Sequence, residues 1–173
     1  MKKFLLFAFA MALLSIAHSQ NVNTYSSKVT FEISNMKFNT VEGTFGGMTG
    51  TVNFDPKDIS NAYMNVCIDA SSVNTGSTKR DEHLRNEDFF HTEKHPEICF
   101  QSTRFEKSND GYVVYGNLNM LESSKEVMIP FNLENNTFQG TFTIQRLDFA
   151  LGEDTGTFLV GNEVEMSIIC ELQ

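Results

Sequence analysis

The sequence predicts an all-β protein, an antiparallel eight-stranded barrel with a short helical insertion between two of its strands. Three observations lead to this prediction. Apolar and polar residues alternate with a period of two in most segments, as they do in strands that bury one face. Turn signals separate these segments at a spacing of roughly 8 to 12 residues. A polar stretch at 71–102, which has the highest charge density of the chain, interrupts the alternation once.

The strands expected before the polar stretch each bury one face, and the first begins near Tyr25. A glycine-rich passage at 41–50 keeps the apolar alternation, so we expect a bent strand there that helps the sheet to curl. In chain order, the apolar faces consist of Val29, Phe31 and Ile33, of Phe45, Val52 and Phe54, and of Met64, Val66 and Ile68.

The polar stretch predicts a short solvated helix. Of the seven residues at 79–85, all but Leu84 are charged or histidine. The helical segment ends in Phe89 and Phe90, and Pro96 excludes a helix beyond it. We expect a polar segment inserted between strands to lie over an opening of the sheet.

The strands expected after the insertion are separated by turns at Asn109-Asp110-Gly111 and at Glu134-Asn135-Asn136. These strands are long and have one polar face, which favours a barrel around a common apolar interior over a sandwich. A barrel of this size is either filled by its side chains or holds one small ligand. The apolar faces consist of Ile98, Phe100 and Phe105, of Tyr112, Val114, Leu118 and Met120, of Val127, Ile129, Phe131 and Leu133, of Phe138, Phe142 and Ile144, and of Val164, Met166, Ile168 and Cys170.

The N-terminal segment has the three parts of a secretory signal peptide. Lys2 and Lys3 form the basic part, an apolar run of about 13 residues follows, and Ala17-His18-Ser19 fits the cleavage rule. The apolar run is shorter than the roughly 20 residues of a membrane-spanning helix. We therefore expect a signal peptide at 1–19, one domain at 20–173, and a periplasmic or secreted location.

The composition excludes nucleic acid as a partner. Of the 13 basic residues, Lys2 and Lys3 lie in the expected signal peptide, which leaves 11 against 22 acidic residues and a net charge of −11. Binding to phosphates requires clustered positive charge, which this domain lacks. The chain contains 16 Phe and 8 Met but no Trp, so we expect a soft apolar interior.

The three cysteines, Cys67, Cys99 and Cys170, all lie in strand segments. Oxidation of one pair is open in an exported protein, and the odd count and the lack of a CxxC spacing say little about it. The interpretation that we favour is buried free thiols. The cysteine spacing carries no metal-site signature.

The chain contains no recognisable catalytic motif. The segment His91–His95 is not an HExxH motif, because Glu93 occupies its third position. GxSxG, Walker and GxGxxG motifs are also absent from the sequence. We therefore predict neither an enzyme nor a metal site, and His83 is the one residue that we would test as an acid or base.

Ordered motifs run through nearly all of the expected mature domain: Val41-x-Gly43-x-Phe45, Phe54-Asp55, Ser72-Val73-Asn74-Thr75-Gly76, Arg80-Asp81-x-His83-Leu84-Arg85-x-x-Asp88-Phe89-Phe90, Pro96-x-Ile98-x-Phe100-x-Ser102, Gly116-x-Leu118, Arg146-x-Asp148-Phe149 and Val160-Gly161-Asn162-x-Val164. Together they resemble the YceI-like family. The resemblance implies an exported, lipocalin-like antiparallel barrel that encloses a long apolar chain, such as the polyisoprenoid tail of a quinone or a related amphiphile. The chain departs from the family pattern at 121–126, where members usually carry a turn with glycine and threonine.

An isoprenoid tail presents only carbon and hydrogen, so its affinity would come from apolar surface removed from water, about 25 cal/mol per Å². The alternative is a dry core, in which case the protein is a structural or interaction protein of the envelope without a ligand. The residues expected to line the tunnel are Phe31, Ile33, Phe45, Phe54, Met64, Val66, Ile68, Ile98, Phe100, Leu118, Ile129, Phe131, Phe142, Ile144 and Met166.

Five polar residues are candidates for the mouth of the tunnel or for a head-group site: Arg80, Asp81, His83, Arg146 and Asp148. Period-two counting from Ile144 places Arg146 and Asp148 on the inward face. Because a buried charge needs a partner, we favour ion pairs that lock the insertion to the barrel end, formed among Arg80, Asp81, Arg85, Arg146 and Asp148. In the second interpretation, Arg80, His83 or Arg146 meets the head group of the ligand.

The predicted function is a carrier or store of one isoprenoid or other long-chain lipid, without a catalytic step. No catalytic cofactor is expected, and the bound molecule would be an isoprenoid quinone or a fatty-acid-like lipid. Transient contact with a membrane or with envelope proteins fits this function, and both a monomer and a homodimer are compatible with the sequence.

Overall fold

The computed structural model describes residues 19–173, and the predicted signal peptide lies outside this range except for Ser19. Among the described residues, no helix has the length and apolar character needed to cross a membrane. The elements are β1 (Gln20–Asn21), β2 (Lys28–Asn35), β3 (Asn39–Phe45), β4 (Thr49–Asp55), β5 (Asp58–Asp69), the 3₁₀ helix η1 (Ala70–Ser72), α1 (Thr78–Arg85), β6 (Glu97–Ser108), β7 (Gly111–Met120), β8 (Ser123–Glu134), β9 (Thr137–Gln145), the 3₁₀ helix η2 (Arg146–Phe149) and β10 (Val160–Glu171).

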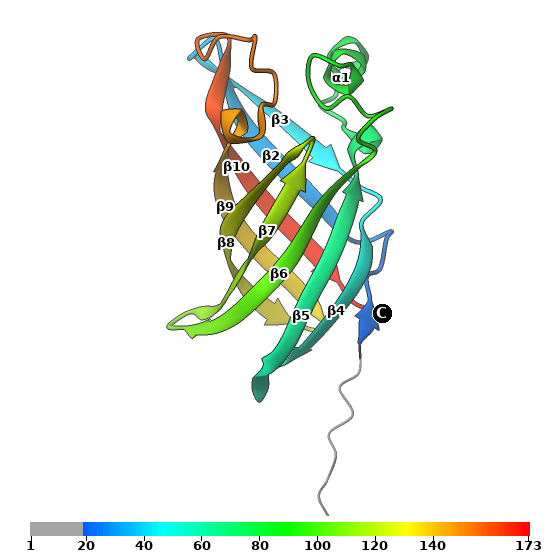
Figure 1. Cartoon of the computed structure of the whole chain (residues 1–173), viewed down its shortest axis with the longest axis vertical. Coiled ribbons are helices and arrows are strands. Elements are labelled where there is room, and N and C mark those ends of the chain that lie inside the picture. The colour runs from blue at the N-terminus through cyan, green and yellow to red at the C-terminus, as the bar shows by residue number, and fades with distance from the viewer. Residues whose placement is uncertain (1–18) are drawn as a thin grey trace, which may run out of the picture.

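The ten strands within residues 19–173 form one antiparallel sheet in the order β1-β4-β5-β6-β7-β8-β9-β10-β2-β3. The sheet curls around an apolar core (Figure 1). The prediction of an all-β antiparallel fold with one short helix is confirmed, whereas the prediction of eight strands is wrong. One additional strand is the short β1. The other arises because the glycine-rich passage forms two strands, β3 and β4, where one was expected.

The glycine-rich passage turns where a bent strand was expected. Gly47 has a φ of +65°, in the left-handed region that favours glycine, and Met48 then packs into the interior. At Gly50 a β-carbon would lie 2.1 Å from the carbonyl oxygen of Asn65. These glycines therefore permit a chain reversal and a close approach of β4 to β5.

Along their unpaired sides, the two edge strands, β1 and β3, are tied to other parts of the chain by isolated bridges and not by continuous strand pairing. Val22, just beyond β1, forms a bridge with Leu172 just beyond β10, and the N–H of Gln173 donates to the carbonyl of Asn21 at 2.9 Å. At the other edge, Thr44 of β3 forms a bridge with Asn74 of the insertion.

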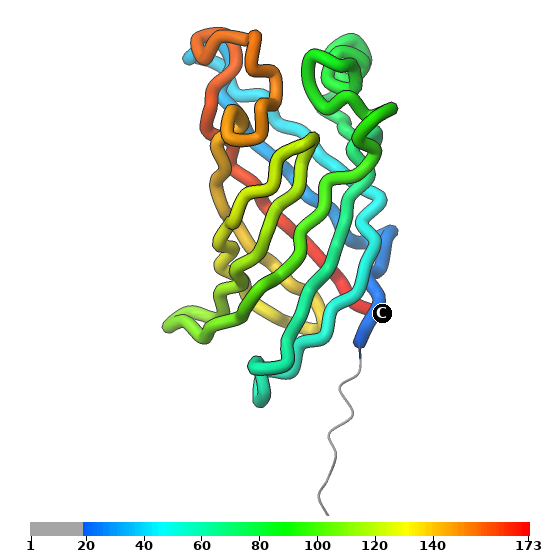
Figure 2. The backbone as a smooth tube through the Cα atoms, in the orientation of Figure 1, coloured from blue at the N-terminus to red at the C-terminus, as the bar shows by residue number. Residues whose placement is uncertain are grey.

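The helical insertion and the loop at 150–159 cover one end of the sheet, the upper end in Figures 1 and 2, and the C-terminus lies at the other end. Helix α1 ends at Arg85, earlier than predicted, and Phe89 and Phe90 follow it as buried residues of the next loop. Arg85 donates to the carbonyls of Ser71 and Val73 at 2.7 and 2.9 Å, which holds α1 against η1 and the residue that follows it.

The sheet is split between β8 and β9. These strands pair only beside their shared turn, from Phe131 with Gly140 to Glu134 with Thr137. Pro130 marks the start of the split and has no N–H to donate to a ladder. A groove of about 400 Å³ lies between the separated parts of the two strands.

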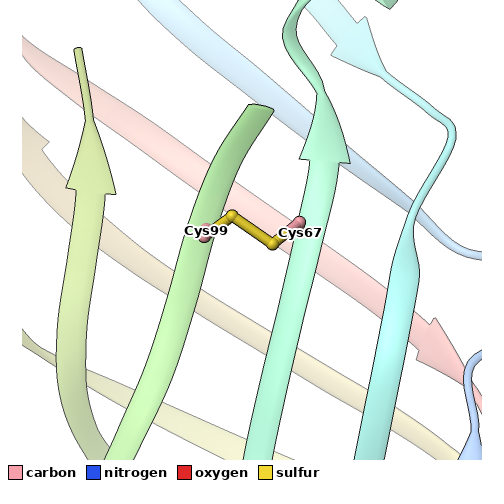
Figure 3. The surroundings of a disulfide bond; sticks show 2 residues. All are labelled: Cys67 and Cys99. Carbon is pink, nitrogen blue, oxygen red and sulfur yellow. A yellow bond between two sulfur atoms is a disulfide. The ribbon is translucent and has the colours of Figure 1, made fainter. Parts of the chain in front are cut away.

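A disulfide joins β5 to β6 across the base of the insertion. Cys67 and Cys99 are direct partners in the register of these strands and are bonded to each other (Figure 3). The interpretation as free thiols is therefore wrong for this pair. Cys170 is free and buried, and burial raises the pKa of its thiol to about 12.

Candidate ligand-binding cavity

A cavity of about 450 Å³ lies inside the curled sheet and extends to the insertion. Its volume is within the range of roughly 300 to 1,000 Å³ that is usual for small-molecule sites. Fourteen of the fifteen residues predicted for the tunnel line it, namely Phe31, Ile33, Phe45, Met64, Val66, Ile68, Ile98, Phe100, Leu118, Ile129, Phe131, Phe142, Ile144 and Met166.

Phe54 does not line the cavity, so its assignment to the tunnel is corrected. Its ring packs against four others, those of Phe105, Tyr112, Phe131 and Phe138, with centroids 4.9 to 5.5 Å apart. This cluster of five aromatic rings fills the sheet near the β4–β5 turn. Phe54 does point inward, but aromatic packing occupies the interior at its level.

Loops supply the part of the lining that the strand pattern did not identify. Met48 comes from the turn between β3 and β4, Phe89 and Phe90 from the insertion, and Leu151 from the loop after η2. Loop side chains follow no period, so alternation gives no signal for them. The Phe89-Phe90 pair did stand out as apolar residues within a polar stretch.

The cavity reaches the surface at the end covered by the insertion. Met36 of the β2–β3 turn, Leu159, and Arg80 and His83 of α1 are exposed and also line the cavity. These residues surround its mouth. Arg80 and His83 are two of the five residues predicted for the mouth or for a head-group site.

Arg146 lines the cavity but is fully occupied by backbone carbonyls. Its guanidinium donates to the carbonyls of Gly161, Leu151, Gly152, Thr155 and Val160 at 2.7 to 3.1 Å. Burial lowers the pKa of Arg146, although an arginine remains charged at neutral pH. These five bonds hold the loop at 150–159 and the start of β10 around the side chain and leave no free donor for a head group.

The ion-pair network that we favoured from the sequence is wrong. The three salt bridges found within residues 19–173 are Lys94–Glu122, Arg104–Glu106 and Arg104–Glu126. β9 ends at Gln145, so period-two counting does not extend to Asp148, which is exposed in η2 and lies outside the cavity. Arg80, Asp81 and Arg85 instead bind backbone and hydroxyl groups of their own segment.

Asp81 is buried within the insertion and also lies outside the cavity lining. It accepts hydrogen bonds from the backbone N–H and the hydroxyl of Thr75, at 2.8 and 2.6 Å. Burial raises the pKa of this carboxyl, but the bonds from Thr75 and the charges of Arg85 and Arg80 outweigh it and lower the pKa overall. Arg80 donates to the hydroxyl and the carbonyl of the same Thr75 at 2.8 and 3.0 Å.

Neither His83 nor the disulfide forms a catalytic or metal-binding arrangement among the described residues. The ring of His83 contacts the edge of Phe89, with centroids 5.2 Å apart. Glu97 lies with Cys67 and Cys99 in a group whose ligand atoms are within 4.8 Å of one another. The two sulfur atoms bond each other, so they present no thiolate to a metal.

Comparison with known proteins identifies close relatives of this domain. Residues 20–172 match the YceI-like domain family. A UPF0312 protein of Pectobacterium atrosepticum is 31% identical over 99% of this chain and 97% of its own length. A UPF0312 protein of Serratia proteamaculans is also 31% identical, over 83% of this chain and 79% of its own.

Solved structures show the same fold. Burkholderia cenocepacia BcnA is 26% identical with a TM-score of 0.78, over 86% of this chain and 98% of that one. A polyisoprenoid binding domain from Saccharophagus degradans is 15% identical with a TM-score of 0.64, over 88% and 98%. Curled sheet, insertion motifs and sequence matches agree, and the chain belongs to the YceI-like family.

Proposed function

We propose that this protein is an exported carrier or store that encloses the apolar chain of a polyisoprenoid, such as a quinone tail, or of another long-chain amphiphile. The observation that carries the proposal is the apolar cavity of about 450 Å³ with an open mouth. A chain that enters it gains about 0.8 kcal/mol for each buried methylene group. The predicted signal peptide supports export to the periplasm or the medium.

The comparisons support the same class of ligand. The Saccharophagus degradans domain of the same fold is described as polyisoprenoid binding. In this chain, phenylalanine and methionine side chains such as Phe31, Phe100, Met64 and Met166 line the cavity. Aromatic faces and flexible thioethers adapt to a kinked branched chain, so this lining suits an isoprenoid.

The function proposed is binding without a chemical step. The cavity lining contains no pair of titratable groups in contact, and Arg146 is saturated by carbonyls. The alternative of a dry barrel that acts only through its surface depends on a filled interior. The cavity favours the carrier.

Extraction of the native ligand tests the proposal. The full-length protein is expressed in its host, purified without detergent, and weighed by native mass spectrometry before and after solvent extraction. We expect an added mass that extraction removes and that corresponds to a prenyl chain or a long acyl chain. The proposal would be overturned if the protein purified from its host had the same mass before and after extraction.

Chain length provides a second test. In a homologous series of saturated chains, affinity should rise about fourfold for each added methylene group until the cavity is full. The length at which the rise stops measures the usable length of the cavity. An affinity that does not depend on chain length would contradict binding in the interior.

A further inference from the structure

Four large apolar side chains are exposed together at the mouth of the cavity. Met36 and Phe38, in the turn between β2 and β3, are 50% and 90% exposed, and Phe158 and Leu159, in the loop before β10, are 56% and 47% exposed. We call these four residues the apolar tip. Exposed apolar clusters of this kind mark sites of contact with a membrane or a protein.

Contacts between the two turns make the apolar tip one surface. The backbone N–H of Met36 donates to the carbonyl of Leu159 at 3.0 Å, and the side-chain amide of Asn35 donates to the same carbonyl at 2.9 Å. The ammonium of Lys37 lies 5.6 Å from the centre of the Phe158 ring. Met36 and Leu159 also line the cavity, so the tip is continuous with the interior.

The backbone of the β2–β3 turn is unfavourable for the residues that it carries. Met36 and Lys37 have φ angles of 49° and 61°, in the left-handed region that side chains other than Asn and Gly rarely adopt. The β8–β9 turn, at the other end of the sheet, has the same two φ angles at Asn135 and Asn136. The β8–β9 turn thus carries asparagines, which tolerate this conformation, whereas the β2–β3 turn carries Met36 and Lys37 in the same conformation.

The charge around the tip indicates what it contacts. Lys37 lies between Met36 and Phe38 of the tip, and Glu153 and Asp154 are exposed in the same loop as Phe158. An anionic surface would therefore gain little from electrostatic attraction. A lysine beside apolar side chains can extend its ammonium to a lipid phosphate while those side chains enter the interface.

We propose that the apolar tip inserts into the surface of a lipid bilayer and brings the cavity mouth against the membrane. The inference rests on the proposed function, because an isoprenoid has negligible solubility in water and is held in membranes. Projecting side chains on two turns fit a fluid interface, whereas a protein partner would need a matching pocket for each of them. Hydrophobic insertion, and not charge, provides the affinity.

A single introduced tryptophan tests the insertion. The chain contains no tryptophan, so Phe38→Trp reports only on the tip, and Tyr25→Trp, at the other end of β2 and 99% exposed, is the matched control. With phosphatidylcholine vesicles, we expect the emission of Phe38→Trp to shift to the blue and brominated acyl chains to quench it. Tyr25→Trp should show neither effect. Equal quenching of both variants, or of neither, would overturn the proposal.

Charge substitution measures the contribution of the tip. Phe38→Asp together with Phe158→Asp should lower partition into phosphatidylcholine vesicles at least about tenfold, while Tyr25→Asp leaves it unchanged. Partition of the unmodified protein should respond weakly to salt and should not increase when phosphatidylglycerol is added. Steep salt dependence would show adsorption by charge and would contradict the proposal.

Transfer of the two asparagines of the β8–β9 turn to the β2–β3 turn distinguishes an effect on membrane binding from an effect on stability. Met36→Asn with Lys37→Asn should raise the urea midpoint, because both residues then tolerate the left-handed conformation, and should lower vesicle partition. A change of both quantities in the same direction would contradict the proposal.

Failure of docking is distinguishable from failure of the carrier function. Phe38 and Phe158 do not line the cavity, so the double aspartate variant should bind a prenyl chain supplied in detergent as the unmodified protein does. If lipid is extracted from the protein but Phe38→Trp does not insert, the docking proposal fails alone. If insertion occurs and no lipid is found, the carrier function fails.

Discussion

At the scale of single residues, buried polar side chains of this domain bind backbone and not one another. Arg146 binds three carbonyls of the loop at 150–159 and two at the start of β10, and Asp81 binds Thr75 at the start of the insertion. Each residue organises one of the two loops at the mouth of the cavity. Their substitution should therefore affect the covered end of the sheet before the strands.

Arg146→Lys should destabilise the domain by roughly 2 to 5 kcal/mol. A lysine keeps the charge, but its three donors on a single nitrogen cannot reach carbonyls spread from Leu151 to Gly161. Urea unfolding measures the loss, and amide hydrogen exchange should rise in the loop at 150–160 more than in β6 or β7. Exchange that rises equally everywhere would contradict a local role for Arg146.

The hydrogen bonds of Asp81 lead us to expect that the insertion loses stability at acid pH. Because its pKa is lowered in the folded state, the carboxylate stabilises the domain above its ordinary pKa of 3.8, and this contribution is lost as the pH falls through the folded value. Thermal unfolding should show Asp81→Asn to be less stable than the unmodified protein at about pH 7, with a smaller difference at about pH 3. Asp88→Asn, at an exposed position of the next loop, is the control and should show little difference at either pH. A gap between Asp81→Asn and the unmodified protein that stays constant with pH would contradict the assignment.

At the scale of elements, strands were predictable from the sequence and loop placement was not. Alternation identified the inward residues of β2, β5, β6, β7 and β9 because a pleat fixes side-chain direction. The same counting placed Arg146 inward correctly but failed at Asp148, after the strand gives way to a 3₁₀ turn. It also could not show that Phe54 meets four other rings, since that contact depends on how the sheet curls.

The cysteine pairing was undetermined for the same reason. Cys67 and Cys99 are 32 residues apart, and only the pairing of β5 with β6 makes them neighbours. The sequence lacked a short spacing that would identify the pair. The insertion lies entirely within the loop that this disulfide closes.

Loss of the disulfide should therefore cost about 3 to 4 kcal/mol by the loop-closure relation. The comparison is made in a Cys170→Ala background, so that no free thiol can exchange with the pair. Cys67→Ala with Cys99→Ala should lower the urea midpoint, and a reductant should lower the midpoint of the background protein to the same value. No response to reductant would show that the two cysteines are not bonded.

At the scale of the whole molecule, the sheet has a filled end and a hollow end. Aromatic rings around Phe54 close the interior near the β4–β5 turn, while the cavity opens between the insertion and the loop at 150–160. At the split between β8 and β9, Phe142 and Ile144 line both the cavity and the outer groove. A ligand chain would therefore enter from the mouth and end at the aromatic cluster.

Substitution by a larger side chain distinguishes this hollow interior from a packed one, because the unfolding free energy falls only where no space is available. Leu118 lines the cavity, so Leu118→Trp has space to occupy and should leave the unfolding free energy unchanged or higher while it lowers ligand affinity. Val52 is fully buried and does not line the cavity, so Val52→Phe should cost roughly 1 to 3 kcal/mol. Urea unfolding of both ligand-free variants and titration with a prenyl chain provide the comparison. If Leu118→Trp destabilises the domain as much as Val52→Phe does, the interior is packed in solution and cannot accommodate a hydrocarbon chain.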